Sequence, residues 1–174
     1  MISPDWCRMM AAYNSEMNRR LYAAASQLSD TARREDRAAW FGSIQGTLCH
    51  LVWADRQWMS RFAGWAPPPP GIAGSPHLIE DWAELCAARS EADARIEGWA
   101  TTLTGEGLAG TLRWFSGASQ QEMTSPRAVA MTHFFNHQTH HRGQAHALIT
   151  QAGIRPAATD LPWIVDLKAL GLPS

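Results

Sequence analysis

Apolar residues recur at alternating steps of three and four along four long segments of the chain, and this spacing constrains the fold more than any other feature. In the first segment they are Trp6, Met10, Tyr13, Met17, Leu21, Ala24 and Leu28. Such spacing places the apolar side chains on one face of an α-helix. Ser3 and Pro4 precede them and are typical of a helix N-terminus, where serine caps free amides and proline is tolerated. Four such helices with little strand signal predict an all-α fold, a four-helix bundle.

Three further helices are expected, at about residues 43–62, 78–101 and 125–153. For the last one we expect Ser125 to be the N-cap, Pro126 the first helical residue and Gly153 the stop. Residues 30–36 are polar and are expected to form a connection. The interval before the last helix is rich in glycine, so it is expected to be irregular or to form a short hairpin. The strands of that hairpin would be residues 111–115 and 120–124.

The segment from Gly64 to His77 interrupts the helical pattern completely. It contains four consecutive prolines, Pro67 to Pro70, and a helix interior cannot accommodate them. The segment is also longer than the loops that join antiparallel neighbours in a bundle. We therefore expect it to form either a crossover at one end of the bundle or a lid beside a site.

Composition excludes several classes of function. The 174 residues, expected to form one domain over 1–174, carry 15 basic and 16 acidic side chains, and no basic block suggests a nucleic-acid partner. No apolar run approaches the length that spans a membrane, and no signal peptide is evident. Cys7, Cys49 and Cys86 are odd in number and form no CxxC pair, a pattern typical of a reducing compartment. A cytoplasmic protein with no membrane partner is the expectation.

Two histidines of the last helix are the best candidates for metal ligands. His137 and His141 are four residues apart, so both side chains project from one helix face, near the centre of its apolar stripe. His133 with His137 is the second-best pair. A buried imidazole without partners costs about 1–3 kcal/mol, and a shared metal ion would satisfy both acceptor nitrogens. For this pair taken alone, hydrogen-bonded histidines without a metal are about as probable as a metal site.

A third ligand is available on the second helix. His50 borders the apolar stripe of that helix, and bundles commonly build metal sites from side chains on facing helices. Cys49 is rotated by about 100° around the helix and is not expected to be a ligand. Asp55 also lies away from His50, and His77 is expected to be merely a polar residue near a helix start.

The sequences around these histidines resemble those of the DinB/YfiT-like superfamily of small metal-binding bundles, which is unrelated to the DNA polymerase of similar name. The resemblance rests on two stretches, residues 50–55 (His-Leu-Val-Trp-Ala-Asp) and residues 136–144 (Asn-His-Gln-Thr-His-His-Arg-Gly-Gln). It covers nearly the whole chain. It implies that His50, His137 and His141 coordinate one divalent metal with open positions. It also implies an up-down-down-up bundle and, in many members, a homodimer.

The resemblance also suggests which type of reaction the protein could catalyse. Characterised relatives include a mycothiol-dependent maleylpyruvate isomerase and bacillithiol S-transferases. Three neutral imidazoles with an open position are the arrangement of catalytic zinc, which lowers the pKa of bound water or deprotonates a thiol. Zn²⁺ or Ni²⁺ is the expected ion, with a low-molecular-weight thiol as a second cofactor and a small molecule as substrate. The leading hypothesis is a metal-dependent S-transferase or isomerase, although no residue identifies the thiol.

Two other functions stay open. One is a hydrolase in which the metal activates water, with Asp55 or Glu122 as the only carboxylates suggested as a base. The other is a non-enzymatic stress protein that binds a metal or a small ligand. Three tryptophans are expected either in the core or around an apolar cavity: Trp53, Trp58 and Trp114.

We make a separate prediction for each of the three residues that follow His141. Arg142 is rotated from the metal face and is expected to make a structural or subunit contact. Gly143 costs about 1 kcal/mol relative to alanine within a helix, which suggests that another helix approaches closely there. Gln144 is nearer the metal face and is expected to bond to a neighbouring helix or to touch substrate.

Overall fold

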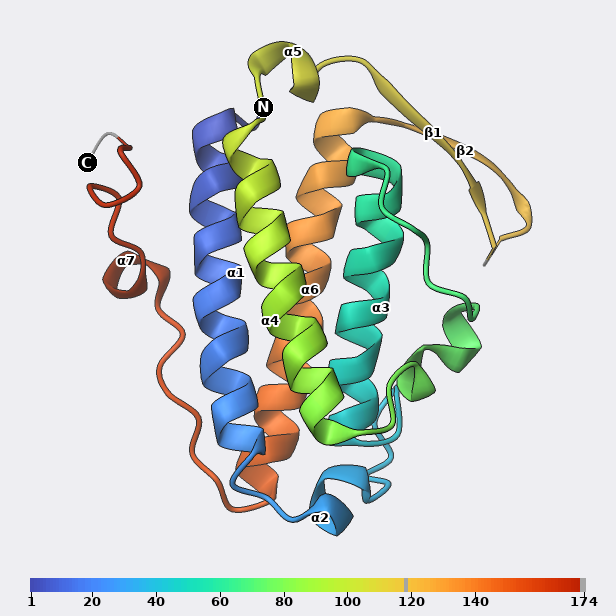
Figure 1. Cartoon of the computed structure of the whole chain (residues 1–174), viewed down its shortest axis with the longest axis vertical. Coiled ribbons are helices and arrows are strands. Elements are labelled where there is room, and N and C mark those ends of the chain that lie inside the picture. Colours follow the sequence, from blue (N-terminus) through green and yellow to red (C-terminus); the bar gives the residue numbers. More distant parts are fainter. Residues whose placement is uncertain (118, 173–174) are drawn as a thin grey trace.

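Four long helices pack side by side in the computed structural model, which describes residues 1–117 and 119–172 (Figure 1). They are α1 (Pro4–Ala25), α3 (Ile44–Ala63), α4 (Trp82–Thr101) and α6 (Arg127–Gln151). The shorter elements are α2 (Asp30–Arg34), the 3-10 helix η1 (Ile72–His77), α5 (Gly105–Leu108), β1 (Thr111–Ser116), β2 (Gln121–Pro126) and α7 (Leu161–Ile164). The expected bundle of helices is present. None of the described helices is both long enough and apolar enough to cross a membrane.

The proline-rich segment sets the direction of α4. In Figure 1, α1 and α6 run down the view, whereas α3 and α4 both run up. Residues 64–81 return along the outside of α3, and η1 within them packs against that helix. The segment therefore carries the chain back to the end of the bundle at which α3 began.

Helix boundaries follow the capping signals at several points. Ser3 Oγ accepts a hydrogen bond from the Trp6 amide (3.1 Å), and Ser43 Oγ accepts one from the Gly46 amide (2.9 Å). Gly153 follows α6 with a φ of 91°, a conformation that favours glycine. The predicted cap of the first long helix, the predicted start of the second near residue 43 and the predicted stop of the last are confirmed.

The predicted start of the third long helix is wrong. It was expected at residue 78, but α4 begins at Trp82, because Asp81 caps it by accepting from the Glu84 amide (2.8 Å). Residues 30–36, expected to be only a connection, contain the short helix α2, capped by Ser29.

The predicted N-cap of the last helix is also wrong. Ser125 and Pro126 belong to β2, where Ser125 lies opposite Leu112 and Pro126 opposite Thr111 in an antiparallel pair with β1. Pairing keeps the backbone extended through Pro126, so the helix starts only at Arg127. The two strands form a hairpin that extends from the end of the bundle near α5 (Figure 1).

The core consists of two apolar clusters separated by buried polar side chains. One cluster takes in residues 21–25 of α1, 44–52 of α3 and 145–149 of α6, and the other takes in 7–11, 59 and 131–135 of the same helices. Between them, on all four long helices, lie the residues that we call the polar layer: Asn14, Asn18, Asp55, Arg89, Asp93, Gln138 and Arg142. The periodicity of the sequence did not reveal this layer.

Hydrogen bonds connect the polar layer across the bundle. Asp55 accepts from Arg89 Nη1 (2.5 Å) through one carboxylate oxygen and from Gln138 Nε2 (2.6 Å) through the other. Arg89 Nε also donates to Asp93 (3.0 Å), and Arg142 Nη2 donates to Asn14 (2.5 Å). Burial raises the pKa of Asp55, and the charge of Arg89 opposes that rise. Each charged side chain of the layer therefore has hydrogen-bond or ion-pair partners that offset the cost of removing it from water.

Candidate metal centre

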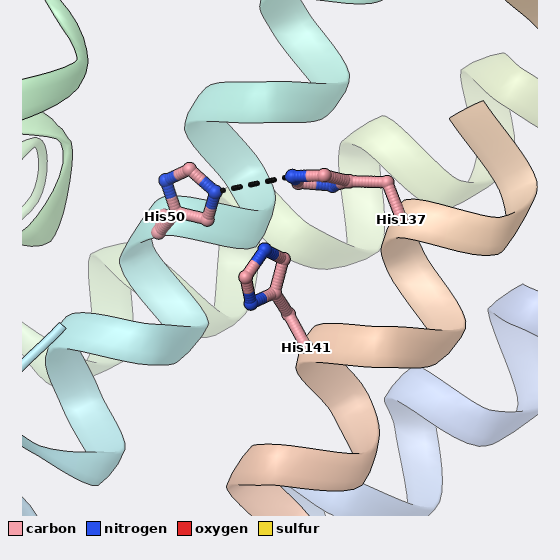
Figure 2. A group of neighbouring side chains, drawn as sticks. All are labelled: His50, His137 and His141. Carbon is pink, nitrogen blue, oxygen red and sulfur yellow. Dashed lines mark hydrogen bonds between the residues drawn. The ribbon is translucent and has the colours of Figure 1, made fainter. Parts of the chain in front are cut away.

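The three histidines suggested by the sequence meet between α3 and α6. His50 projects from α3, and His137 and His141 project from successive turns of α6, so the three rings converge (Figure 2). One ring nitrogen of each lies within 4.8 Å of the other two. We call these residues the histidine triad.

The spacing of one pair of ring nitrogens fits two ligands of a tetrahedral ion. His50 Nε2 and His137 Nε2 are 3.4 Å apart. If both rings are neutral with bare Nε2 atoms, two lone pairs face each other at this distance, which a shared cation would relieve. Two nitrogen ligands of zinc, each about 2.0–2.1 Å from the ion, are separated by about 3.3–3.4 Å in tetrahedral geometry. The donor set, three imidazoles without a carboxylate, is also one that Zn²⁺ or Ni²⁺ accepts.

Two polar side chains orient the triad. Gln144 Oε1 lies 2.7 Å from His141 Nδ1, and because a carbonyl oxygen can only accept, Nδ1 carries the proton and Nε2 is free. Ser75 Oγ, in η1, lies 2.8 Å from His50 Nδ1 and can accept a hydrogen bond from it, which leaves Nε2 of His50 free. Gln144 thus contacts a histidine of its own helix, not a neighbouring helix as expected. Partners of this kind fix the tautomer that a metal requires.

Burial keeps the triad neutral. The pKa of His50 is lowered to about 3, mainly by burial and further by His137 and His141. The pKa of His137 is lowered to about 3, again chiefly by burial. Burial also lowers the pKa of His141, although its bond to Gln144 opposes the effect. Neutral imidazole is the form that binds a metal, so the protein does not have to lose protons from these rings at physiological pH.

An aromatic side chain that the sequence did not reveal covers part of the triad. Phe41, in the loop between α2 and α3, stacks on His50 with ring centroids 3.7 Å apart, and its centroid is 5.2 Å from that of His141. Gly46 permits this approach, because an added Cβ would lie 2.3 Å from the Phe41 carbonyl oxygen and 3.3 Å from Pro76 Cβ. The loop that carries Phe41 and the 3-10 helix η1, which carries Ser75, both pack closely against α3 at this glycine.

The other candidate ligands do not join the triad. Cys49 Sγ donates to the Ile79 carbonyl (3.1 Å), in agreement with its predicted rotation away from the site. His77 is exposed and lies 3.1 Å from Glu80. His133 packs against Trp58 instead, and it is exposed.

Neither carboxylate suggested as a base lies with the triad. Asp55 is 1% exposed and is held in the polar layer, and Glu122 is exposed on β2. Arg142 makes the structural contact that was expected, because it is buried among polar groups of α1 and α6. The expectation for Gly143 is wrong: an added Cβ would meet no atom within 4 Å, since this residue faces a groove beside α1.

Removing the hydroxyl of Ser75 is expected to weaken metal binding without abolishing it. Ser75→Ala would leave His50 without its partner, and outer partners of this kind are typically worth about 10- to 100-fold in metal affinity. Competition with a chromophoric chelator measures the effect. Ser60→Ala is the control, because Ser60 lies on the same helix as His50 but its hydroxyl donates only to the Gln57 carbonyl of that helix. Equal affinities of Ser75→Ala and wild type would contradict the assigned role.

Comparison with known proteins agrees with this arrangement. The family model described as "DinB family" matches residues 4–170, which is almost the whole chain. The chain belongs to the DinB family. Among curated proteins no significant match to this DinB chain is found.

Two solved structures share the DinB fold of this chain. A DinB-like protein from Bacillus cereus superposes with a TM-score of 0.63 at 17% identity, over 84% of this chain and 90% of the other. YfiT from Bacillus subtilis superposes with a TM-score of 0.63 at 16% identity, over 88% and 91% of the two chains. YfiT is described as a probable metal-dependent hydrolase with an unusual four-helix-bundle topology. At these identities the likeness establishes the fold.

Proposed function

We propose that this DinB-family chain binds one divalent cation through His50, His137 and His141 and catalyses a thiol-dependent transfer or isomerisation of a small molecule. The observation that carries the proposal is the convergence of three neutral imidazole nitrogens within 4.8 Å, with no carboxylate among the ligands. Such a set leaves the charge of the cation uncompensated and a position open, as in catalytic zinc sites.

The residues around the triad have distinct roles in this proposal. A bound cation supplies Lewis-acid chemistry, because it lowers the pKa of a thiol or water at its open position. Ser75 and Gln144 hold two of the imidazoles in the required tautomer. Phe41 and Trp53, whose rings lie 3.7 Å and 5.7 Å from that of His50, shield the site from bulk water. Shielding strengthens the electrostatic interactions within the site.

A thiol is the preferred nucleophile because the site has no base of its own. Neither Asp55 nor Glu122 is near the triad, and no other Asp or Glu of the described residues lies within ligand distance of it. A thiol loses its proton on binding the cation and needs no carboxylate to remove it. This argument distinguishes a thiol-dependent reaction from one that relies on a carboxylate base.

Hydrolysis is the second candidate, and one observation favours it. The fold is shared with YfiT, which is described as a probable metal-dependent hydrolase. The triad by itself could promote hydrolysis, since zinc lowers the pKa of bound water to about 7. We further propose, for either reaction, that the helices are connected up-down-down-up and that the bound ion is Zn²⁺ or Ni²⁺. We also propose that the protein is a homodimer in the cytoplasm.

A two-substrate assay separates the candidates. Untagged protein loaded with Zn²⁺ or Ni²⁺ would be incubated with 1-chloro-2,4-dinitrobenzene and a small thiol, and separately with 4-nitrophenyl acetate and no thiol. We expect turnover of the first substrate that a chelator abolishes and that His141→Ala lacks, whereas His146→Ala, outside the triad, retains it. Ester hydrolysis without thiol would favour the second candidate. Turnover unchanged in His141→Ala would refute both.

A further inference from the structure

Arg61 occupies an unusual position on the same helix as His50. Its guanidinium carbon lies 4.5 Å from the ring centroid of Trp58 and 5.3 Å from that of Trp114, which comes from β1. The two indoles are themselves 5.6 Å apart. The guanidinium of Arg61 is therefore held in place by aromatic surfaces from α3 and from the hairpin, which restrict the rotamers of this long side chain.

The guanidinium lacks the polar partners that comparable arginines have. Four arginines of the described residues lie over aromatic rings: Arg33, Arg61, Arg95 and Arg142. The other three also bond to a carbonyl, a carboxylate or an amide oxygen. Arg61 makes no hydrogen bond or ion pair with the described residues, and none of its nitrogens is fully enclosed. Its N–H edge is thus available to a ligand.

A continuous row of rings joins Arg61 to the triad. The ring of Trp58 is 5.1 Å from that of His133, which is 5.6 Å from that of His137. The guanidinium lies at the level of Trp58, which is eight residues after His50, or about 12 Å along the helix at about 1.5 Å per residue. A molecule longer than a single amino acid could span this distance.

No acid faces Arg61 from the hairpin. Trp114 pairs with Met123, and Glu122 pairs with Phe115, so the alternation of the strands puts the Glu122 side chain on the opposite face from Trp114. The charge of Arg61 also contributes to lowering the pKa of His133, after burial. Neither the hairpin nor His133 therefore places a negative charge beside Arg61, which suits an anionic ligand.

We propose that Arg61, held by Trp58 and Trp114, binds a carboxylate of the substrate or thiol cofactor whose reacting atom lies at the triad. The inference rests on the proposed function and adds to it a substrate class, elongated carboxylates. Stacking occupies the faces of the guanidinium and leaves its edge for the two parallel hydrogen bonds that a carboxylate accepts. Arg61 is thus a specificity-determining residue held beside Trp58, about 12 Å along the axis of α3 from His50.

Calorimetric titration of the metal-loaded protein tests the proposal with two matched probes. The probes are S-methylglutathione, which has carboxylates but no free thiol, and its diethyl ester, which has neither. We expect wild type to bind the acid about tenfold or more tightly than the ester. Arg61→Met, which retains an apolar side chain against the indoles, should lose this preference. Arg61→Lys, which keeps the charge without the planar fork, should retain part of it.

The outcomes distinguish this inference from the proposed function. Equal preferences in wild type and Arg61→Met, or no preference in wild type, would overturn the assignment of Arg61. Because the probes lack a thiol, a positive result stands even if the thiol-dependent reaction fails in the assay above. Unchanged near-ultraviolet circular dichroism and melting temperature of Arg61→Met would show that lost binding does not arise from unfolding.

Discussion

Replacement of His141 by alanine is expected to lower the affinity for a divalent cation by more than about 100-fold. Outer partners of metal-bound histidines are worth about 10- to 100-fold, so loss of a ligand itself should exceed that range. His50→Ala should have a comparable effect, since each variant leaves only two imidazoles. Elemental analysis of untagged protein and chelator competition measure the change.

The control for this prediction is another histidine of the same helix. His146 lines the groove beside α1 and is not part of the triad, so His146→Ala should bind metal as wild type does. One equivalent of metal bound with unchanged affinity in both His141→Ala and His50→Ala would show that the triad is not the metal site. A histidine tag must be absent, since its imidazoles would bind the same ions.

Replacement of Arg89 by methionine is expected to reduce the free energy of unfolding by about 3–5 kcal/mol. Arg89 is 3% exposed and bonds to Asp55 and Asp93, so its loss would leave two buried carboxyl groups without their bonded cation. Urea denaturation of the metal-free protein measures the change as a shift of the midpoint. The deficit should diminish at low pH, because protonation removes the buried negative charges.

Two further variants test the explanation for Arg89. Arg34→Met removes exposed ion pairs with Asp30 and Glu80 and should cost less than about 1 kcal/mol, because water screens such pairs. Adding Asp55→Asn and Asp93→Asn to Arg89→Met should restore part of the lost stability, since no unpaired charge then stays buried. A loss below 1 kcal/mol in Arg89→Met would contradict the role of the polar layer.

The sequence predicted those features that depend on the regular spacing of a helix. Steps of three and four residues located the long helices, and the interval of four residues put His137 and His141 on one face. His50 could be added because its place beside an apolar stripe is also a matter of helical phase. These predictions use only positions within one element, which explains their success.

The features that the sequence missed depend on contacts between elements. Ser75 in η1 and Phe41 in a loop both contact His50 directly, and neither segment has a periodic pattern that could predict these contacts. Pro126 resembled a helix start, but pairing with β1 held it in a strand. Capping signals depend only on neighbouring residues, so they cannot reveal strand pairing with a segment more than ten residues away.

The bond between Asp55 and Gln138 joins the two helices that carry the triad, and Gln138 is the immediate neighbour of His137. If α6 slid along α3 by one turn, about 5.4 Å, it would separate this pair and set a carboxylate against hydrocarbon. The bond between Asp55 and Gln138 therefore helps to fix how α6 is aligned along α3, and with it the position of the histidine triad. We therefore expect exchanges among leucine, methionine and phenylalanine in the two apolar clusters to leave the three imidazoles together, provided that this bond is kept.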